Sequence, residues 1–179
     1  MSCTFEQNYG QTELTAGRPM CASLAPGALV QPGVYEFGLV SILDEELGNS
    51  ILSSWQWLFF DAIGVAATWQ GNVFFWSPKR SACFYLDAES GKSIQVAETV
   101  EALVNDVLPS ENAKANLLRF DGFQEVYDRM GELQYGRCYY PRPLPMLGGS
   151  GNLDTYGEGD MEVYLAIVAQ TFKHILDNR

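Results

Sequence analysis

The chain has 179 residues, of which 47% are hydrophobic, so it is long enough to fold as one domain whose core needs no disulfide bond or metal. Its 22 acidic residues outnumber its 11 basic residues and give a net charge of -11, which disfavours direct binding to nucleic acid or to an anionic membrane. The same charge would attract a basic protein partner, or would simply keep the protein soluble.

The N-terminal region differs in composition from the rest of the chain. It is rich in Gly, Pro, Ser and Thr and shows weak hydrophobic periodicity. We therefore expect residues 1–34 to be an irregular N-terminal arm and residues 35–179 to form a single α+β domain. No basic segment followed by an apolar one opens the chain, and Asp61 interrupts the longest apolar run. The sequence thus predicts neither a signal peptide nor a membrane span, and we expect the protein in the cytoplasm.

Regular apolar periodicity begins shortly after this region. Apolar residues recur at helical spacing over residues 39–55, and Gly48 and Asn49 interrupt the pattern. This arrangement predicts two short helices, or one helix with a kink.

Strand-forming residues follow. Segments rich in Val and aromatic residues predict strands, and each segment ends at a turn-forming sequence. QGN at residues 70–72 is typical of a tight hairpin turn, while SPKR at 77–80 and DAESGKS at 87–93 predict two further turns. We expect residues 65–96 to form an antiparallel meander of about four strands or more.

Helical patterns cover much of the remaining sequence. Thr99 can cap a helix whose apolar stripe ends before Pro109, and a second helical pattern covers residues 113–130. A last amphipathic helix is expected over residues 161–176. This order of elements predicts an α+β fold, in which helices pack mainly on one face of an antiparallel sheet.

The segment PRPLPMLGGSG, residues 141–151, combines prolines with glycines. A phosphate-binding loop would carry a Lys directly after its glycines, but none is present, and Asp154 would repel a phosphate. Prolines restrict the backbone and glycines permit positive φ or close approach, so we expect a shaped connecting loop. The residues expected to shape it are Pro143, Pro145, Gly148, Gly149 and Gly151.

Few residues suggest catalysis. The four cysteines form no CxxC pair and the chain has one His, so no metal site or cofactor is expected. Cys138 and His174 could act as nucleophile and base in a small hydrolase, as could a pair of carboxylates, but a half-buried Cys on a strand and a surface His on a helix are commoner. Asp61 lies in an apolar run and is expected to be a buried, hydrogen-bonded structural carboxylate, with a functional carboxylate as the alternative.

Aromatic residues offer a second alternative, a small ligand-binding or scaffold domain with an aromatic groove. Such residues usually form core, and only exposed rings facing one another would support a groove. The candidates are Trp55, Trp57, Trp69, Trp76, Tyr85, Tyr139 and Tyr140.

Two stretches, residues 87–111 and 154–162, are strongly acidic. Each could be ordinary solvated surface, or together they could form a face that docks a basic partner. Exposed carboxylates add little to folding, so we expect the acids of this face to be dispensable for stability. The candidate partner-binding residues are Glu98, Glu101, Asp154, Glu158, Asp160 and Glu162.

Two longer segments carry a family resemblance. The first, VAATWQGNVFFWSPKRSACFYLDAESGKSIQVAETVEALVNDVL, has a hairpin, a strand ending in Leu-Asp, a Gly-containing turn and a helix. The second, GELQYGRCYYPRPLPMLGGSGNLDTYGEGDMEVYLAIVAQTFKHI, has a Gly-x-Cys-Tyr strand, a Pro-x-Leu-Gly-Gly loop and a closing helix. Together they resemble the C-terminal domain of type VI secretion immunity proteins, which neutralise a secreted DNase toxin. The resemblance covers roughly residues 50–176.

The resemblance implies a non-enzymatic protein whose partner is a cognate toxin, with no catalytic residue to transfer. A basic toxin such as a nuclease would fit the acidic surface. The sequence departs from the family at Gly71-Asn72, where Gly-Asp is typical, and at Ala169-Gln170, where Gly-Gln is typical. Residues 1–35 resemble nothing in the family, and the separate upstream domain of many members is not seen.

Overall fold

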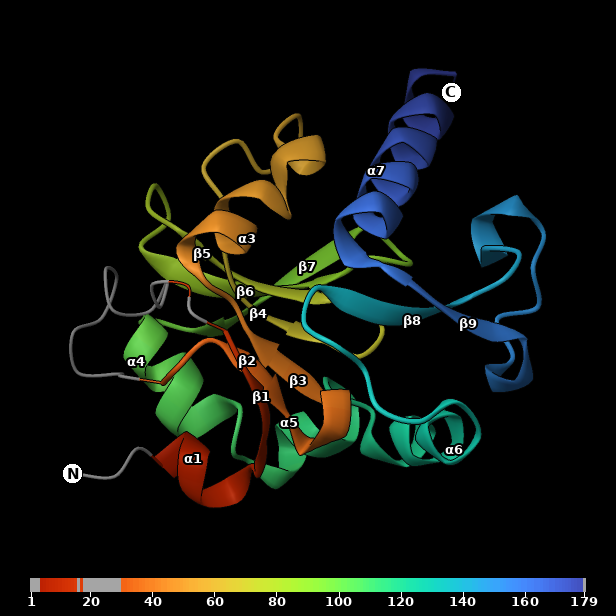
Figure 1. The fold of residues 1–179 in the computed structure, drawn as a ribbon. Helices are drawn as coiled ribbons and strands as arrows, with labels where there is room; N and C mark the ends of the chain where they lie inside the picture. The colour runs from red at the N-terminus through yellow and green to blue at the C-terminus, as the bar shows by residue number, and fades with distance from the viewer. Residues whose placement is uncertain (1–3, 16, 18–29, 179) are drawn as a thin grey trace.

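Seven strands form one antiparallel sheet within residues 4–15, 17 and 30–178, the part of the chain that the computed structural model describes (Figure 1). Each strand pairs with its neighbour in sequence, so the sheet is a meander with β1 and β7 at its edges. The strands are β1 (Gln11–Leu14), β2 (Gly33–Tyr35), β3 (Val40–Ile42), β4 (Ile63–Thr68), β5 (Val73–Ser77), β6 (Ala82–Asp87) and β7 (Lys92–Ala97).

The predicted meander is confirmed as β4–β7, but the sheet is larger than expected. Strands β2 and β3 have three residues each, too short for a period of two to be recognised in the sequence. The prediction of helix over residues 39–55 is therefore wrong for Val40–Ile42, which form the strand β3. It is right for the two short helices that follow, α3 (Glu45–Ser50) and the 3₁₀ turn η2 (Ser53–Trp55).

The expectation of an irregular segment before residue 35 is wrong for the part that the structure describes. Residues Thr4–Asn8 form α1, and β1 follows it and pairs with β2. Phe5 and Tyr9 are buried against the sheet, and the Tyr9 hydroxyl donates a hydrogen bond to the Leu108 carbonyl oxygen at 2.5 Å. Isolated apolar residues among Gly and Pro gave no periodic signal, although their burial fixes this segment.

The remaining helical elements follow β7. Thr99 caps α4 as predicted, with its hydroxyl accepting from the Ala102 amide at 3.0 Å, and the helix continues into a π-helical turn before Pro109. The pattern over residues 113–130 is divided into two helices at Arg119, whose φ is 49°. No helix in the described part of the chain is long and apolar enough to cross a membrane. The elements are η1 (Glu36–Gly38), α4 (Val100–Ala102), η3 (Leu103–Val107), α5 (Glu111–Asn116), α6 (Phe120–Met130), η4 (Pro145–Leu147), η5 (Leu153–Thr155) and α7 (Met161–Asp177).

Helices cover both faces of the sheet, which corrects the expectation that they pack mainly on one. Successive side chains of a strand point to opposite faces, and here each face has its own buried core. Phe74 and Tyr85 pack in the core shared with α1, η3 and α6. Phe75 and Phe84 pack in the core shared with η2 and α7. Figure 1 shows α3 and α7 on one side of the sheet and α1 and α5 on the other. The α+β class is confirmed, with the sheet as its middle layer.

A second, two-stranded sheet of β8 (Arg137–Pro141) and β9 (Tyr156–Asp160) lies against the turn between β4 and β5. The Tyr139 amide donates to the Trp69 carbonyl oxygen at 2.7 Å, and the Gln70 amide nitrogen donates to the Tyr156 hydroxyl at 3.0 Å. Gly71 sits at the centre of this contact, with a φ of 75°. A Cβ there would lie 2.8 Å from the Tyr164 ring, so the position needs Gly for conformation and for space.

We predict that Gly71→Ala lowers the free energy of unfolding by about 2 kcal/mol or more, because positive φ and a steric clash act together. Gly148→Ala is the matched control, because Gly148 has a φ of 91° but nothing lies within 4 Å of an added Cβ. This variant should lower the free energy of unfolding only by the cost of positive φ. Urea unfolding of the two variants measures the difference. Equal losses would show that the contact with Tyr164 does not matter.

Candidate functional site

The acidic stretch at residues 154–162 has mixed roles in the structure. Asp160 caps α7, its carboxylate accepting from the Val163 amide at 2.9 Å. Glu158 pairs with Arg137, with 2.9 Å between Nε and Oε1. Asp154 and Glu162 are exposed. The expectation that all of these acids are dispensable for folding is therefore wrong for Asp160, because its carboxylate satisfies a free amide at the start of the helix.

Glu98 and Glu101 are exposed beside the start of α4. Figure 1 shows α4 and β9 well apart, on opposite sides of the molecule. The structure therefore does not bring the six predicted acids into one face. Their common property is a long-range negative field rather than a shared contact surface.

The loop of residues 141–151 has the close backbone approach that its glycines predict. Gly148 and Gly151 have positive φ, at 91° and 70°. A Cβ on Gly149 would lie 1.9 Å from the Pro143 carbonyl oxygen. Pro145 begins the 3₁₀ turn η4. These glycines are therefore required by the conformation of the loop itself, through positive φ or close backbone approach.

The structure does not bring Cys138 and His174 together. Cys138 is fully buried on β8, and burial raises the pKa of its thiol well above the ordinary value, which disfavours a nucleophilic thiolate. His174 is exposed in the last turn of α7, roughly 20 Å along the helix from its start beside Gly136. Asp61 accepts from the Ser77 hydroxyl and the Lys79 amide, as expected of a structural carboxylate, but it is half-buried and not fully buried.

The proposed aromatic groove is also not formed. Trp69, Tyr85 and Tyr139 are buried in the core on one face of the sheet, and Trp55 is buried in the core on the other. Trp57 is the most exposed of the candidates, at 37%. These rings stabilise the two cores and do not face a common cavity.

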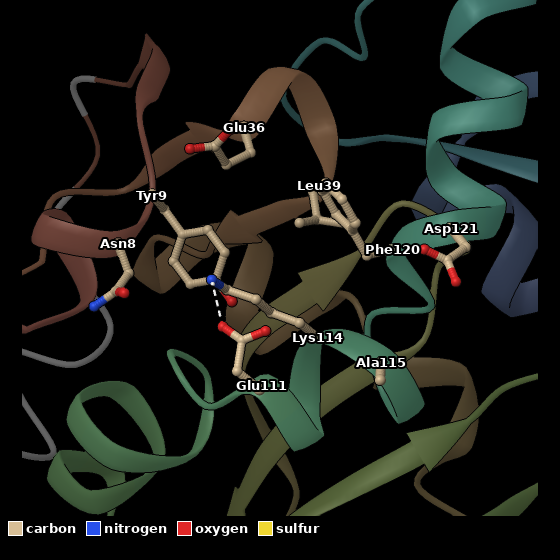
Figure 2. Close-up of a pocket in the computed structure, with 9 residues that line it drawn as sticks. All are labelled: Asn8, Tyr9, Glu36, Leu39, Glu111, Lys114, Ala115, Phe120 and Asp121. Atoms are coloured by element: carbon tan, nitrogen blue, oxygen red, sulfur yellow. Dashed lines mark hydrogen bonds and ion pairs between the residues drawn. The ribbon is translucent and has the colours of Figure 1, made fainter.

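A different cavity lies where the N-terminal elements meet α5 and α6 (Figure 2). It has a volume of about 360 Å³. A second hollow of about 360 Å³ adjoins it through the shared residues Glu36 and Phe120. We call the two hollows together the acidic groove. Its lining residues are Asn8, Tyr9, Glu36, Phe37, Leu39, Glu111, Lys114, Ala115, Phe120, Asp121, Phe123, Gln124, Tyr127 and Asp128.

One wall of the acidic groove is the turn η1, which the edge strand holds in place. The Glu36 carboxylate accepts from the Gly10 amide at 2.5 Å, and the Phe37 amide donates to the Thr12 hydroxyl at 2.9 Å. Gly38 packs so closely on Leu133 that a Cβ would lie 2.5 Å from the Leu133 Cβ. The wall is therefore fixed by contacts with segments on both of its sides.

The opposite wall is the break between α5 and α6. The Trp69 indole N–H donates to the Leu118 carbonyl oxygen at 2.6 Å, and the Tyr85 hydroxyl donates to the Leu117 carbonyl oxygen at 3.1 Å. Carbonyl groups at the end of a helix lack partners within it, so these two side chains satisfy the end of α5 and set where α6 begins. Phe120 and Asp121, in the first turn of α6, are thereby placed at the groove.

The groove combines negative charge with aromatic surface. Its lining includes four carboxylates, from Glu36, Glu111, Asp121 and Asp128, and one ammonium group, that of Lys114. Lys114 pairs with Glu111 at 3.3 Å and lies 5.5 Å from the centre of the Tyr9 ring (Figure 2).

Tyr9 lies at the base of this charged set. Burial, followed by the charges of Glu111 and Glu36, raises the pKa of Tyr9 above its usual range. Its hydroxyl therefore remains a proton donor to Leu108 at neutral pH.

Phe37 and Glu36 adopt a backbone conformation that side chains seldom take. Their φ values are 58° and 47°. The Phe37 side chain is 45% exposed, and its ring centre lies 5.5 Å from that of Tyr127. Positive φ costs a Phe about 1–2 kcal/mol relative to Gly, which offsets part of the stabilisation that the covered part of the ring gives.

Sequence reasoning did not find the acidic groove. Its walls come from α1, from η1 and from the pair α5 and α6, three segments that are far apart in the chain and become neighbours only through the sheet. The one local signal was Phe37, an aromatic residue between Glu36 and Gly38 that belongs to no periodic pattern.

The cap at Asp160 leads to a stability prediction. We expect Asp160→Ala to lower the free energy of unfolding by about 1 kcal/mol, because the Val163 amide loses its partner. Asp154→Ala, a neighbouring exposed acid, should change it by less than about 0.5 kcal/mol. Urea unfolding of both variants tests this; an equal effect of the two substitutions would contradict the assignment of Asp160 as a cap.

Comparisons with known proteins support the family resemblance. Residues 97–171 match the family model described as the C-terminal domain of the T6SS (type VI secretion system) immunity protein Tdi1. The match covers α4–α6, β8, β9 and most of α7, whereas residues 50–96, where we also expected the resemblance, lie outside it. A search of curated proteins gave no match.

A solved structure has the same fold over nearly the whole chain. The crystal structure of Atu4351 from Agrobacterium tumefaciens aligns with a TM-score of 0.65 and 15% sequence identity, covering 95% of this chain and 89% of that chain. At this identity the likeness concerns the fold alone. The resemblance seen in the sequence is thus confirmed over residues 97–171, where the chain is similar to the C-terminal domain of the T6SS immunity protein Tdi1.

Proposed function

We propose that this protein neutralises a secreted type VI toxin by binding it, without catalysis. The observation that carries the proposal is the match of residues 97–171 to an immunity-protein family, which supports a toxin-neutralising role. Proteins of this kind act by occluding their partner, and the burial of Cys138 fits a role that needs no nucleophile. On this proposal the protein acts in the cytoplasm of the cell that makes it.

The partner that best fits the chain is a basic toxin, such as a nuclease. The net charge of -11 would slow an encounter with an acidic protein and speed one with a basic protein. A nuclease binds phosphates through a basic surface, and carboxylates presented by this protein would take the place of those phosphates. The exposed acids Glu98, Glu101, Asp154 and Glu162 would contribute to the attracting field.

The direct test is co-expression with the product of the neighbouring gene. We expect the two proteins to purify as a complex, and we expect cells that express the toxin to survive only when this protein is also made. A toxin that neither binds this protein nor is neutralised by it, for every neighbouring gene tried, would rule out the proposed function.

The role of the exposed acids gives a kinetic prediction. Reversing the charge of Asp154 and Glu162 together should slow association with the toxin by about two- to tenfold at low salt and weaken its salt dependence. Dissociation should change little, because both side chains are exposed. The melting temperature should fall by only a few degrees, because Glu162 lies in the first turn of α7, where a positive charge is unfavourable. Stopped-flow mixing at several salt concentrations measures these rates.

Lys173→Glu, at an exposed position of α7, is the control of opposite sign. It makes the protein more negative and should therefore speed association with a basic toxin. An association rate that is the same for all of these variants at low salt would assign the acidity to solubility alone.

A further inference from the structure

We infer that the acidic groove is where this protein docks a basic segment of its toxin, with Phe37 as an aromatic contact; the inference rests on the proposed function. The groove is the described hollow in which negative charge and exposed aromatic surface occur together. A segment carrying Arg or Lys would match both features, because these cations pair with carboxylates and also stack on aromatic rings.

The charges of the groove are available to a partner. Asp121 and Asp128 are exposed on α6, and no ion pair among the described residues involves either of them. The one ammonium group of the groove is already engaged by Glu111 and by the ring of Tyr9 (Figure 2). A bound cation would therefore meet uncompensated carboxylates.

The size of the groove suits side chains of an extended protein segment. Each hollow has a volume of about 360 Å³, which is within the range of sites that enclose small ligands. The two hollows adjoin at Glu36 and Phe120, so side chains from successive positions of one segment could occupy both.

Phe37 gives the groove an exposed aromatic surface. Its ring lies beside Tyr127 at the rim, while its backbone takes a conformation that Asn or Gly would adopt at lower cost. The exposed part of this ring is available for a contact with another molecule.

Other exposed apolar surfaces fit a basic partner less well. The hollow beside Leu58 and Phe60 carries Lys79 and Arg80, which would repel a basic segment. Val163 and Ile167 are exposed on α7, but they line none of the described hollows. A second copy of this chain would bring the same net charge of -11 to the acidic groove, so self-association there is disfavoured.

The test compares groove variants with matched controls in binding to the co-purified toxin. We expect Phe37→Asn to raise the Kd by about tenfold or more, mainly through faster dissociation, while the melting temperature is unchanged or higher. Asp121→Asn combined with Asp128→Asn should weaken binding similarly. Asp154→Asn with Glu162→Gln removes the same charge outside the groove and should affect only the association rate. Unchanged Kd values for both groove variants would overturn the inference and leave the proposed function standing.

A second measurement examines the groove without the toxin. The peptide acetyl-Arg-Phe-Arg-Arg-amide is titrated into the ¹⁵N-labelled full-length protein. We expect amide shifts concentrated at residues 36–38 and 120–128, and we expect Phe37→Asn to reduce them. Shifts centred elsewhere, or spread evenly over the acidic surface, would overturn the inference.

The toxin-binding and peptide experiments distinguish a failure of the proposed function from a failure of the inference about the groove. If the wild-type protein binds no neighbouring toxin, the proposed function fails, whereas the peptide result still decides the chemistry of the groove. Sedimentation of wild type and Phe37→Asn at rising concentration provides the last check. A dimer that forms in wild type and is lost in the variant would make a second copy the occupant, against our inference.

Discussion

The tight turn between β4 and β5 is the constraint on which the rest of this structure depends. Its backbone is held by Gly71, the one residue type that fits both the positive φ and the short distance to Tyr164. The residues on either side of it anchor three separate segments. Trp69 and Gln70 bind β8 and β9, and the Asn72 side chain accepts from the Ala88 amide at 2.9 Å, which fixes the turn after β6.

The same turn also stabilises one wall of the acidic groove, at the break between α5 and α6. Trp69 extends into the core below the sheet, packs against Phe123 with 5.9 Å between ring centres, and binds the carbonyl group at the end of α5. Because this bond sets the break between α5 and α6, it also places the acids at the start of α6. The wall at η1 is built independently, through its bonds with β1. On our proposal, this scaffold presents the acidic groove to the toxin.

The elements that were predicted from the sequence are those whose pattern is local. The strands β4–β7, their turns, the cap at Thr99 and helix α7 each carry their signal within a few residues. The sheet strands β1–β3 were missed because short strands lack a recognisable period. The covering of both faces was missed because the aromatic residues of β5 and β6 indicate burial without indicating what covers them. The acidic groove could not be predicted, since Glu36 and Asp121 meet only through the folded sheet.

Net charge is a property of the whole molecule, whereas binding depends on which carboxylates lie at the contact surface. The net charge was known from composition, but the structure separates carboxylates that serve the fold, such as Asp160, from those that remain exposed, such as Asp121. Hydrogen–deuterium exchange of the complex with the co-purified toxin tests most directly whether the toxin binds at the acidic groove. Our account predicts new protection at residues 36–39 and 120–128. Protection confined to α4 or to the outer face of α7, with the groove unchanged, would contradict it.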